Sequence, residues 1–579
     1  MIQEFIHMIF ASVICMAWGL PFLRLFKRGS ESAAFWCPSF LSLLAFLFFC
    51  GTMALNFISS WLLLFMPLNF PLLSIFCLLL TGWLFLNRSG LIRFARQMKL
   101  SWFSFSPGDI FYILISIVLF IALGSLKPVN NDTQIYHLQI IAWLSDYGAV
   151  PGTANLFPRF GLGSGWFNLV SLLQFPGGGK SYSFLNAAFV SWAFIWLFEK
   201  YRVHRKTGGI AASALSFFYF ALSIYYMLDW QLFRDAANST NYDFPVTFYT
   251  TIVLSFLIED LIYNERPRAI SFLFLFFSFT LITFKFSGIF ILAPAAFYFF
   301  RIKKIRPLLS AGGILLVLLL PVLIKNYIGT GYPLYPLPLS IHKPDWQLPA
   351  PLTEGLYRYI LNSNRYYNAP FSAAPMETSP LYWGPVWFRG ILLQHRVIFL
   401  GALVSLLYLG FAKPSLIRNL PHLKLFSVVL AGMTAGWFFS APDPGRFGYG
   451  VLLPIVLFVL SLVIYPYWKP LFYKIAVLLV AVPLTFYTYI KVSPLLKEPV
   501  YLVRAMAGDH PPFVSRSING IEIHMPEIIN NNWNCRCYDI EPPCSCGENP
   551  YLQTRGKQVK DGFRFSPAPD SLFVKNYIY

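Results

Sequence analysis

The sequence predicts an all-α polytopic membrane protein, a helical bundle with about 14 spans. Hydrophobic residues make up 57% of the chain and charged residues only 12%, and the mean hydropathy is +0.58. A soluble protein needs more charge than this to cover its surface. Aromatic residues reach 19%, which is typical of lipid-facing helices and of the aromatic belts at membrane interfaces.

A membrane-spanning helix needs about 20 apolar residues, although shorter ones are tolerated. The candidate spans are 5–26, 39–56, 70–87, 108–124, 182–198, 209–228, 244–263, 270–283, 287–300, 307–325, 392–411, 425–440, 451–467 and 475–490. Segment 5–26 is interpreted as a retained span rather than a cleaved signal, because no basic residues precede its apolar run. The pair 270–283 and 287–300 is expected to make two short passes, with one long tilted helix as the alternative.

The net charge of +19 is concentrated in short basic clusters between the apolar segments. These clusters contain very few acids and lie at 24–28, 88–99, 200–206, 266–268, 301–306, 413–424 and 469–474. Cytoplasmic loops have this distribution, so the charge does not indicate a nucleic-acid partner. With the clusters inside, the N-terminus, the loops 125–181 and 326–391 and the tail 491–579 are expected on the outer side.

The tail 491–579 differs in composition from the rest and is expected to form a small soluble domain. Four of the eight cysteines of the chain lie in it: Cys535, Cys537, Cys544 and Cys546. On the outer side of a membrane these residues are disulfide candidates. A zinc site is the alternative, although the C-x₂-C spacing usual for zinc is absent.

The loop 125–181 holds the strongest candidate for chemistry. Asp132 lies just past the end of the span 108–124. Two apolar stretches follow, 135–144 and 166–175, and both are too short to cross a membrane. We expect them to form helices that lie in the membrane interface.

An acidic residue at a membrane exit, followed by two juxtamembrane helices, resembles the first outer loop of the GT-C superfamily of membrane glycosyltransferases. In that superfamily the loop begins with an Asp or an acidic pair, and the pair reads Asn131-Asp132 here. The chain is also similar to a bacterial family of polytopic membrane proteins taken to be glycosyltransferases. The features that carry this similarity are Asp132 to His137, Val150 to Leu156, Arg159 to Gly161, Ser164 to Phe167, Gly331 to Pro336, Arg446 to Gly450 and Cys537 to Cys544.

The resemblance implies a GT-C-like transmembrane core at 108–490, between a three-span extension at 1–107 and an extracytoplasmic domain at 491–579. It also implies that a sugar moves from a polyprenyl-phosphate-linked donor to a glycan, lipid or protein acceptor at the outer face. Asp132 is the expected general base. Basic residues near the outer ends of the spans are expected to bind the donor phosphate: Arg446, Arg159, Lys285 and Lys325.

The acidic candidates also have structural interpretations. Asp132 and Asp243 both precede helical segments, where Asp is a common N-cap. The alternative for Asp243, together with Asp235, is an acid or metal ligand beside Asp132. For Arg446, the alternative to phosphate binding is a salt bridge with Asp443.

The remaining candidates have competing interpretations as well. Lys285 and Lys325 would otherwise extend their ammonium groups to the lipid headgroups. His137 is expected on the polar face of its helix, with a role at the site as the alternative. Tyr136 and Trp166 are expected to anchor the loop at the membrane interface, with sugar binding as the alternative.

No Walker or Rossmann glycine motif is present, which argues against a nucleotide-driven transporter and fits a lipid-linked donor. A divalent metal is left open. The loop 326–391 is rich in Tyr, Trp and Pro and is expected to cover the site. The alternative functions are a flippase or transporter of a lipid-linked glycan, a polysaccharide polymerase or ligase, and a non-catalytic scaffold. The expected location is the bacterial inner membrane, with the large loops on the periplasmic side.

Overall fold

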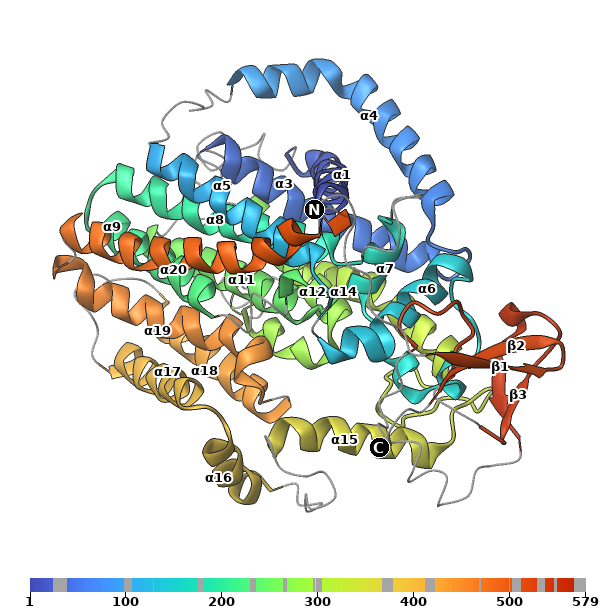
Figure 1. Cartoon of the computed structure of the whole chain (residues 1–579). Helices are drawn as coiled ribbons and strands as arrows, with labels where there is room; N and C mark the ends of the chain where they lie inside the picture. The colour runs from blue at the N-terminus through green and yellow to red at the C-terminus, as the bar shows by residue number, and fades with distance from the viewer. Residues whose placement is uncertain are drawn as a thin grey trace.

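The protein is a bundle of long helices with small β-sheets at one end (Figure 1). Its structure, a computed structural model, describes residues 1–23, 39–97, 107–128, 130–174, 182–229, 236–263, 268–294, 297, 305–366, 379–411, 422–440, 442–467, 470–498, 500–501, 512–527, 537–545 and 549–566.

The long helices are α1 (Ile2–Gly19), α3 (Phe40–Leu62), α4 (Phe70–Gln97), α5 (Pro107–Ser125), α8 (Phe184–Thr207), α9 (Ile210–Leu228), α11 (Asp243–Tyr263), α12 (Arg268–Phe284), α14 (Ile305–Thr330), α17 (Leu393–Phe411), α18 (Leu423–Ser440), α19 (Tyr449–Ile464) and α20 (Pro470–Lys497). Shorter helices lie in the connections: α6 (Leu138–Asp146), α7 (Gly165–Leu172), α15 (Ala350–Arg365) and α16 (Pro380–Gly390). The helices α6 and α7 confirm the two short helices predicted in the loop 125–181.

Nine helices within the described ranges are long and apolar enough to cross a membrane. They coincide with the predicted spans that begin at residues 5, 39, 70, 209, 244, 307, 392, 425 and 451. Shorter apolar helices lie within α5 and α12, and α8 and α20 occupy two further predicted spans. The prediction of an α-helical protein with several membrane-spanning helices is therefore confirmed, while the total of about 14 spans stays a prediction.

The segment 270–300 is not one uninterrupted helix. α12 ends at Phe284, and Lys285 then has an extended backbone with φ −155° and ψ 117°. The 3-10 turn η5 (Phe286–Ile291) follows. Part of 287–300 lies outside the described residues, so the second short pass stays a prediction.

The first two predicted spans are packed into the body of the bundle. α1 lies against α3, and both helices contact α8. The α1–α3 crossing is so close that a Cβ added at Gly51 would lie 1.6 Å from the carbonyl oxygen of Cys15, and small residues permit such close approach between membrane helices. α4 instead lies apart from the bundle along much of its length (Figure 1). The division between 1–107 and 108–490 stays a prediction.

Buried ion pairs mark the end of the bundle where α8 and α11 finish. Glu259 at the end of α11 accepts from Lys200 at 3.0 Å and lies 3.0 Å from Nε2 of His204. Arg202 of α8 lies 3.6 Å from Asp109 at the start of α5. The two helix ends and the start of α5 therefore meet, as the predicted alternation of the spans requires.

In the described part of the tail, two antiparallel hairpins lie beside α6 (Figure 1). β1 (Phe513–Ile518) pairs with β2 (Ile521–Pro526), and β3 (Leu552–Thr554) pairs with β4 (Phe563–Phe565). The first hairpin turns at Asn519-Gly520, where φ is 52° and 84°. Two successive left-handed residues of these types are typical of a tight β-hairpin turn.

The tail also contains a disulfide between Cys537 and Cys544. The disulfide prediction is confirmed for this pair, and the zinc alternative is wrong for it because both sulfur atoms are bonded to each other. Cys535 and Cys546 lie outside the described residues, so their pairing stays a prediction.

Candidate functional site

Five charged side chains from different segments meet at the end of the bundle that carries the loop 125–181. Asp132 precedes the π-turn η2 (Thr133–His137), Arg159 lies in the 3-10 turn η4 (Pro158–Gly161), Asp243 begins α11, Lys285 follows α12, and Arg446 lies in the π-turn η7 (Pro444–Gly448). Ion pairs connect all five side chains into one network, called here the charged cluster. Each of the five was a candidate from the sequence.

Asp243 is the buried anchor of the charged cluster. Its side chain is only 4% exposed and binds two cations: Lys285 Nζ lies 2.8 Å from Oδ1, and Arg446 Nε lies 2.5 Å from Oδ2. Its own backbone N–H donates to Oδ1 of Asn241. α11 begins at Asp243, and the carbonyl of Tyr242 accepts the first helical hydrogen bond, from Val246. Asp243 is therefore not the N-cap, and the predicted capping role is wrong.

Arg446 bridges the two carboxylates of the cluster. In addition to its contact with Asp243, its Nη2 lies 3.3 Å from Oδ2 of Asp132. The backbone of Arg446 is held on both sides, since its N–H donates to Oδ1 of Asp443 at 3.2 Å and its carbonyl accepts from the Thr247 hydroxyl at 2.5 Å. Asp443 therefore orders the turn, and the predicted alternative of a salt bridge between the two side chains is wrong. The Arg446 side chain remains 43% exposed, so a ligand can reach it.

Asp132 is the more accessible carboxylate, with 26% of its side chain exposed. It occupies the N-cap position of η2 but makes no capping hydrogen bond, because Asn130 Oδ1 accepts from the Thr133 N–H instead. Its oxygens face Arg446 at 3.3 Å and Arg159 at 3.8 Å. Both contacts are long for charge-assisted hydrogen bonds. Either guanidinium can therefore exchange its contact with Asp132 for one with another anion at a small cost in free energy.

Arg159 lies between aromatic rings. Its Cζ is 5.1 Å from the ring centre of Tyr359 and 6.0 Å from that of Phe157. Such packing orients a guanidinium and leaves its N–H groups available to an anion. Tyr359 belongs to α15, so the loop 326–391 reaches the charged cluster. Whether that loop covers a bound substrate stays a prediction.

The electrostatics of the cluster favour an anionic ligand. The carboxylate of Asp243 raises the pKa of Arg446 well above its usual value. Burial lowers the pKa of Lys285, and Asp243 opposes this shift. Burial raises the pKa of Asp443, which disfavours its ionised form. Three basic side chains face two carboxylates in the cluster, and the basic Arg446 is the most exposed of the five, so an anion can approach it.

His137 and Tyr136 are buried next to Asp132 rather than exposed. His137 is 1% exposed, its Nδ1 lies 3.2 Å from the Thr240 hydroxyl, and burial lowers its pKa to about 4. The predicted polar-face position is therefore wrong. Tyr136 is 5% exposed, and burial together with the charge of Asp132 raises its pKa. Its predicted role as an interface anchor is also wrong.

Two further candidates, Trp166 and Lys325, do not join the charged cluster. Trp166 is fully buried in α7 and donates from Nε1 to Asn186 at 2.7 Å, so it is neither an interface anchor nor a sugar platform. Lys325 contacts Asn168 at 3.4 Å and lines a cavity of about 40 Å³ between α6 and α14. Asp235 lies outside the described residues.

The donor set of the cluster does not suit a metal ion. Among the residues that the structure describes, no three His, Cys, Asp or Glu side chains are grouped closely enough to hold one. Both oxygens of Asp243 face cations, which would repel a divalent ion. The alternative role of Asp243 as a metal ligand is not supported.

Sequence reasoning missed three residues that support the cluster. Thr247 lies one helical turn after Asp243, and this spacing was a usable signal because such residues share a helix face. The ring of Tyr242 lies 5.4 Å from the ammonium of Lys285. No sequence pattern indicated Tyr359, because its contact with Arg159 depends on how the loop 326–391 folds.

The comparisons with known proteins identify a family. No curated protein and no solved structure shows significant similarity to the chain. A family model described as "Domain of unknown function (DUF8201)" matches residues 1–453. The match includes all five members of the charged cluster and ends before the tail. The chain therefore belongs to the DUF8201 family.

Proposed function

We propose that the protein transfers a sugar from a polyprenyl-phosphate-linked donor to an acceptor at the outer, periplasmic face of the bacterial inner membrane. The observation that carries the proposal is the charged cluster, in which one accessible carboxylate lies between two guanidinium groups at the end of a membrane bundle. Glycosyl transfer from a lipid phosphate needs both elements: a base for the acceptor proton and cations for the departing phosphate.

In this proposal Asp132 is the general base and Arg446 and Arg159 bind the donor phosphate. The acceptor oxygen bonds to the anomeric carbon while the bond from that carbon to the phosphate oxygen breaks. The acceptor proton moves to Asp132, and the polyprenyl phosphate leaves with the negative charge. Attack from the face opposite the phosphate inverts the anomeric configuration.

The ion pairs of Asp132 suggest how the base becomes available. Without substrate, its negative charge is shared with Arg446 and Arg159 over 3.3 and 3.8 Å. A donor phosphate forms shorter, bidentate contacts with guanidinium groups and takes them from Asp132. The carboxylate is then less stabilised and more basic, so donor binding itself prepares the base.

Lys285 has a different role in the proposal from the one predicted. Its ammonium is 2.8 Å from Asp243 and only 19% exposed, so it is occupied by a buried carboxylate. We assign Lys285 and Asp243 to the positioning of Arg446 rather than to phosphate binding.

Asp132→Asn tests the proposal, with Asp345→Asn as the matched control because Asp345 is 44% exposed and also pairs with two arginines. The purified variants are placed in lipid nanodiscs. Native mass spectrometry measures polyprenyl phosphate binding, and the release of polyprenyl phosphate from a panel of polyprenyl-phosphate sugars measures transfer.

Asp132→Asn is expected to lower transfer at least about 100-fold, the usual contribution of a general base. Polyprenyl phosphate should bind at least as tightly as to the wild type, because the competing negative charge is gone. If Asp132→Asn transfers sugar at the wild-type rate, Asp132 is not the base. If it binds polyprenyl phosphate more weakly than the wild type, Asp132 does not compete with the phosphate for Arg446.

A further inference from the structure

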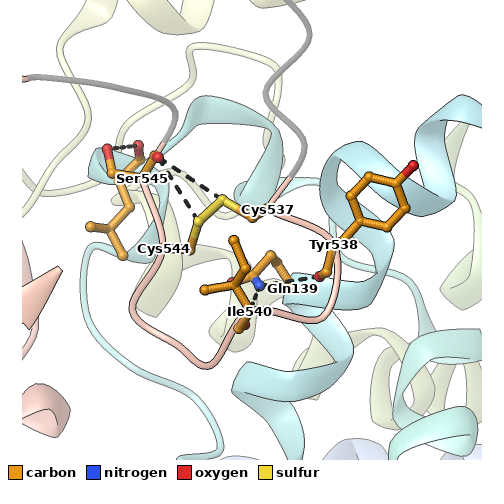
Figure 2. Close-up of a disulfide and its surroundings, with 7 residues drawn as sticks. Gln139, Cys537, Tyr538, Ile540, Cys544 and Ser545 are labelled. Atoms are coloured by element: carbon orange, nitrogen blue, oxygen red, sulfur yellow. Dashed lines mark hydrogen bonds between the residues drawn. A yellow bond between two sulfur atoms is a disulfide. The ribbon is translucent and has the colours of Figure 1, made fainter. Parts of the chain in front are cut away.

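The tail docks on the outer loop that carries Asp132 through residues 537–545, called here the disulfide loop. Figure 2 shows Gln139 of α6 pointing into this loop. Its Nε2 donates to the carbonyl oxygens of Tyr538 at 3.2 Å and Ile540 at 2.7 Å. Gln139 is fully buried, so these hydrogen bonds form away from water, where losing a partner is costly.

Tyr538 brings the disulfide loop within two residues of Asp132. Its hydroxyl donates to Oε1 of Gln134 at 2.5 Å, and its backbone N–H donates to the Gln134 carbonyl at 3.2 Å. The Nε2 of Gln134 donates in turn to the carbonyl of Pro128 at 2.7 Å. The Gln134 side chain therefore closes the turn that contains Asp132, and Tyr538 holds that side chain in place.

The position of Asp132 depends on this turn more than is usual for a helix-capping residue. Its carboxylate makes no capping hydrogen bond to η2 and only long contacts with Arg446 and Arg159, so its position depends largely on the backbone around it. A single π-helical turn such as η2 is a rare conformation that frequently lies at functional sites. A displacement of about 1 Å at a reacting group can lower a rate about 100-fold, so external support for this turn matters.

The disulfide explains how an irregular loop can supply that support. Tyr538 has a left-handed backbone with φ 47°, a conformation that is costly for a residue with a side chain. The adjacent disulfide joins Cys537 to Cys544, seven residues apart and both fully buried. A covalent closure of this kind reduces the number of alternative loop conformations and so favours the one that presents Tyr538 to Gln134.

We propose that the disulfide loop is a positioning element for Asp132, which acts through Tyr538 and Gln134. The inference rests on the proposed function in one respect, the role of Asp132 as the base. It assigns to the tail, which lies outside the residues matched by the family model, a part in the chemistry of the bundle.

Two variants of the full-length protein test the inference: Tyr538→Phe, which removes one hydroxyl, and Cys537→Ala with Cys544→Ala, which opens the loop. Matched controls remove the same groups elsewhere. Tyr489→Phe removes a hydroxyl from a residue that is 67% exposed on α20. Cys15→Ala with Cys50→Ala removes two buried sulfur atoms that form no disulfide.

Hydrogen exchange of the peptides that cover 128–139 measures how well η2 is held in place, and this measurement does not depend on activity. Tyr538→Phe is expected to accelerate exchange there roughly fivefold, the effect of one lost hydrogen bond of ordinary strength, and the cysteine pair at least as much. The two controls should leave these peptides unchanged. Unchanged exchange in both test variants would overturn the inference, whatever the transfer assay shows.

Transfer and phosphate binding then separate positioning from general destabilisation. Both test variants should transfer more slowly while binding polyprenyl phosphate at least as well as the wild type. In an Asp132→Asn background, Tyr538→Phe should cause no further loss of transfer, because the group it positions is absent. If Tyr538→Phe lowers transfer in the Asp132→Asn background as much as it does in the wild type, the inference is overturned. If the wild type itself shows no transfer, the proposed function is overturned, and the hydrogen-exchange result alone then tests the positioning role of the disulfide loop.

Discussion

Neutralising Asp243 removes the carboxylate that pairs with both Lys285 and Arg446. Asp243→Asn keeps the size of the side chain and deletes only its charge. The pair with Lys285 is mostly buried, with side chains 4% and 19% exposed, and breaking a buried pair by removing one partner costs about 3–5 kcal/mol. The pair with Arg446 is 43% exposed on the arginine side, so solvent screening limits it to about 1 kcal/mol or less. We therefore expect Asp243→Asn to lower the free energy of unfolding by about 4 kcal/mol in total.

Asp345→Asn provides the comparison for this estimate. Asp345 also pairs with two cations, Arg555 at 2.9 Å and Arg564 at 3.6 Å, but its side chain is 44% exposed. Exposed pairs contribute about 0–1 kcal/mol. The two variants thus differ mainly in how deeply the mutated carboxylate is buried. This difference predicts that Asp243→Asn loses about 3 kcal/mol more free energy of unfolding than Asp345→Asn.

Hydrogen exchange of the first turn of α11 and of η7 measures the local cost. A loss of about 3 kcal/mol corresponds to exchange accelerated by roughly 100-fold or more. Thermal unfolding followed by tryptophan fluorescence gives an independent ranking of the two variants. If Asp243→Asn is no less stable than Asp345→Asn, Asp243 is not the buried anchor of the cluster.

Three further predictions address the same site. Arg446→Lys keeps the charge but loses the planar fork, so it should weaken polyprenyl phosphate binding about tenfold or more at unchanged expression, and unchanged affinity in the nanodisc assay would contradict the assignment. His137 has a pKa of about 4 in the folded protein, below the value of about 6.5 in an unfolded chain, so the unfolded state binds more protons between these pH values. The contribution of His137 to stability should therefore be full above pH 6.5 and fall by up to about 3 kcal/mol towards pH 4. Denaturation curves of His137→Asn should accordingly depend less on pH over this range than those of the wild type. Glu259→Gln should lower the free energy of unfolding by about 3–5 kcal/mol, because it removes the charge that the buried Lys200 faces at 3.0 Å. The variant that still folds should bind polyprenyl phosphate normally, and loss of binding would place the substrate at the opposite end of the bundle.

The cluster was largely predictable from the sequence because the direction of the spans places residues at one end or the other. Asp132 follows one span, Asp243 precedes another and Arg446 lies in a short loop between two more, so an alternating path brings them to the same end. The partner of each charge was not predictable. Lys285 binds Asp243 instead of a free phosphate because α11 and α12 pack side by side, and helix packing leaves no signal in the spacing of single charges.

The misassigned residues of the loop 125–181 share a physical cause. From the sequence, the loop is expected to lie on the membrane surface, where its helices would have exposed polar faces and aromatic residues that anchor them at the interface. Other segments cover it instead, and Trp166 and His137 become buried between the loop and the helices. Contacts between Tyr538 and Gln134, separated by 404 residues, depend on the docking of the tail, and no local pattern encodes such docking.

The measurement that tests the central claim most directly is a structure of the protein with a bound polyprenyl phosphate. The account predicts that the phosphate lies within hydrogen-bonding distance of Arg446 and Arg159 and that Asp132 has moved away from both guanidinium groups. A phosphate bound at the opposite end of the bundle, beside Lys200 and Glu259, would contradict it.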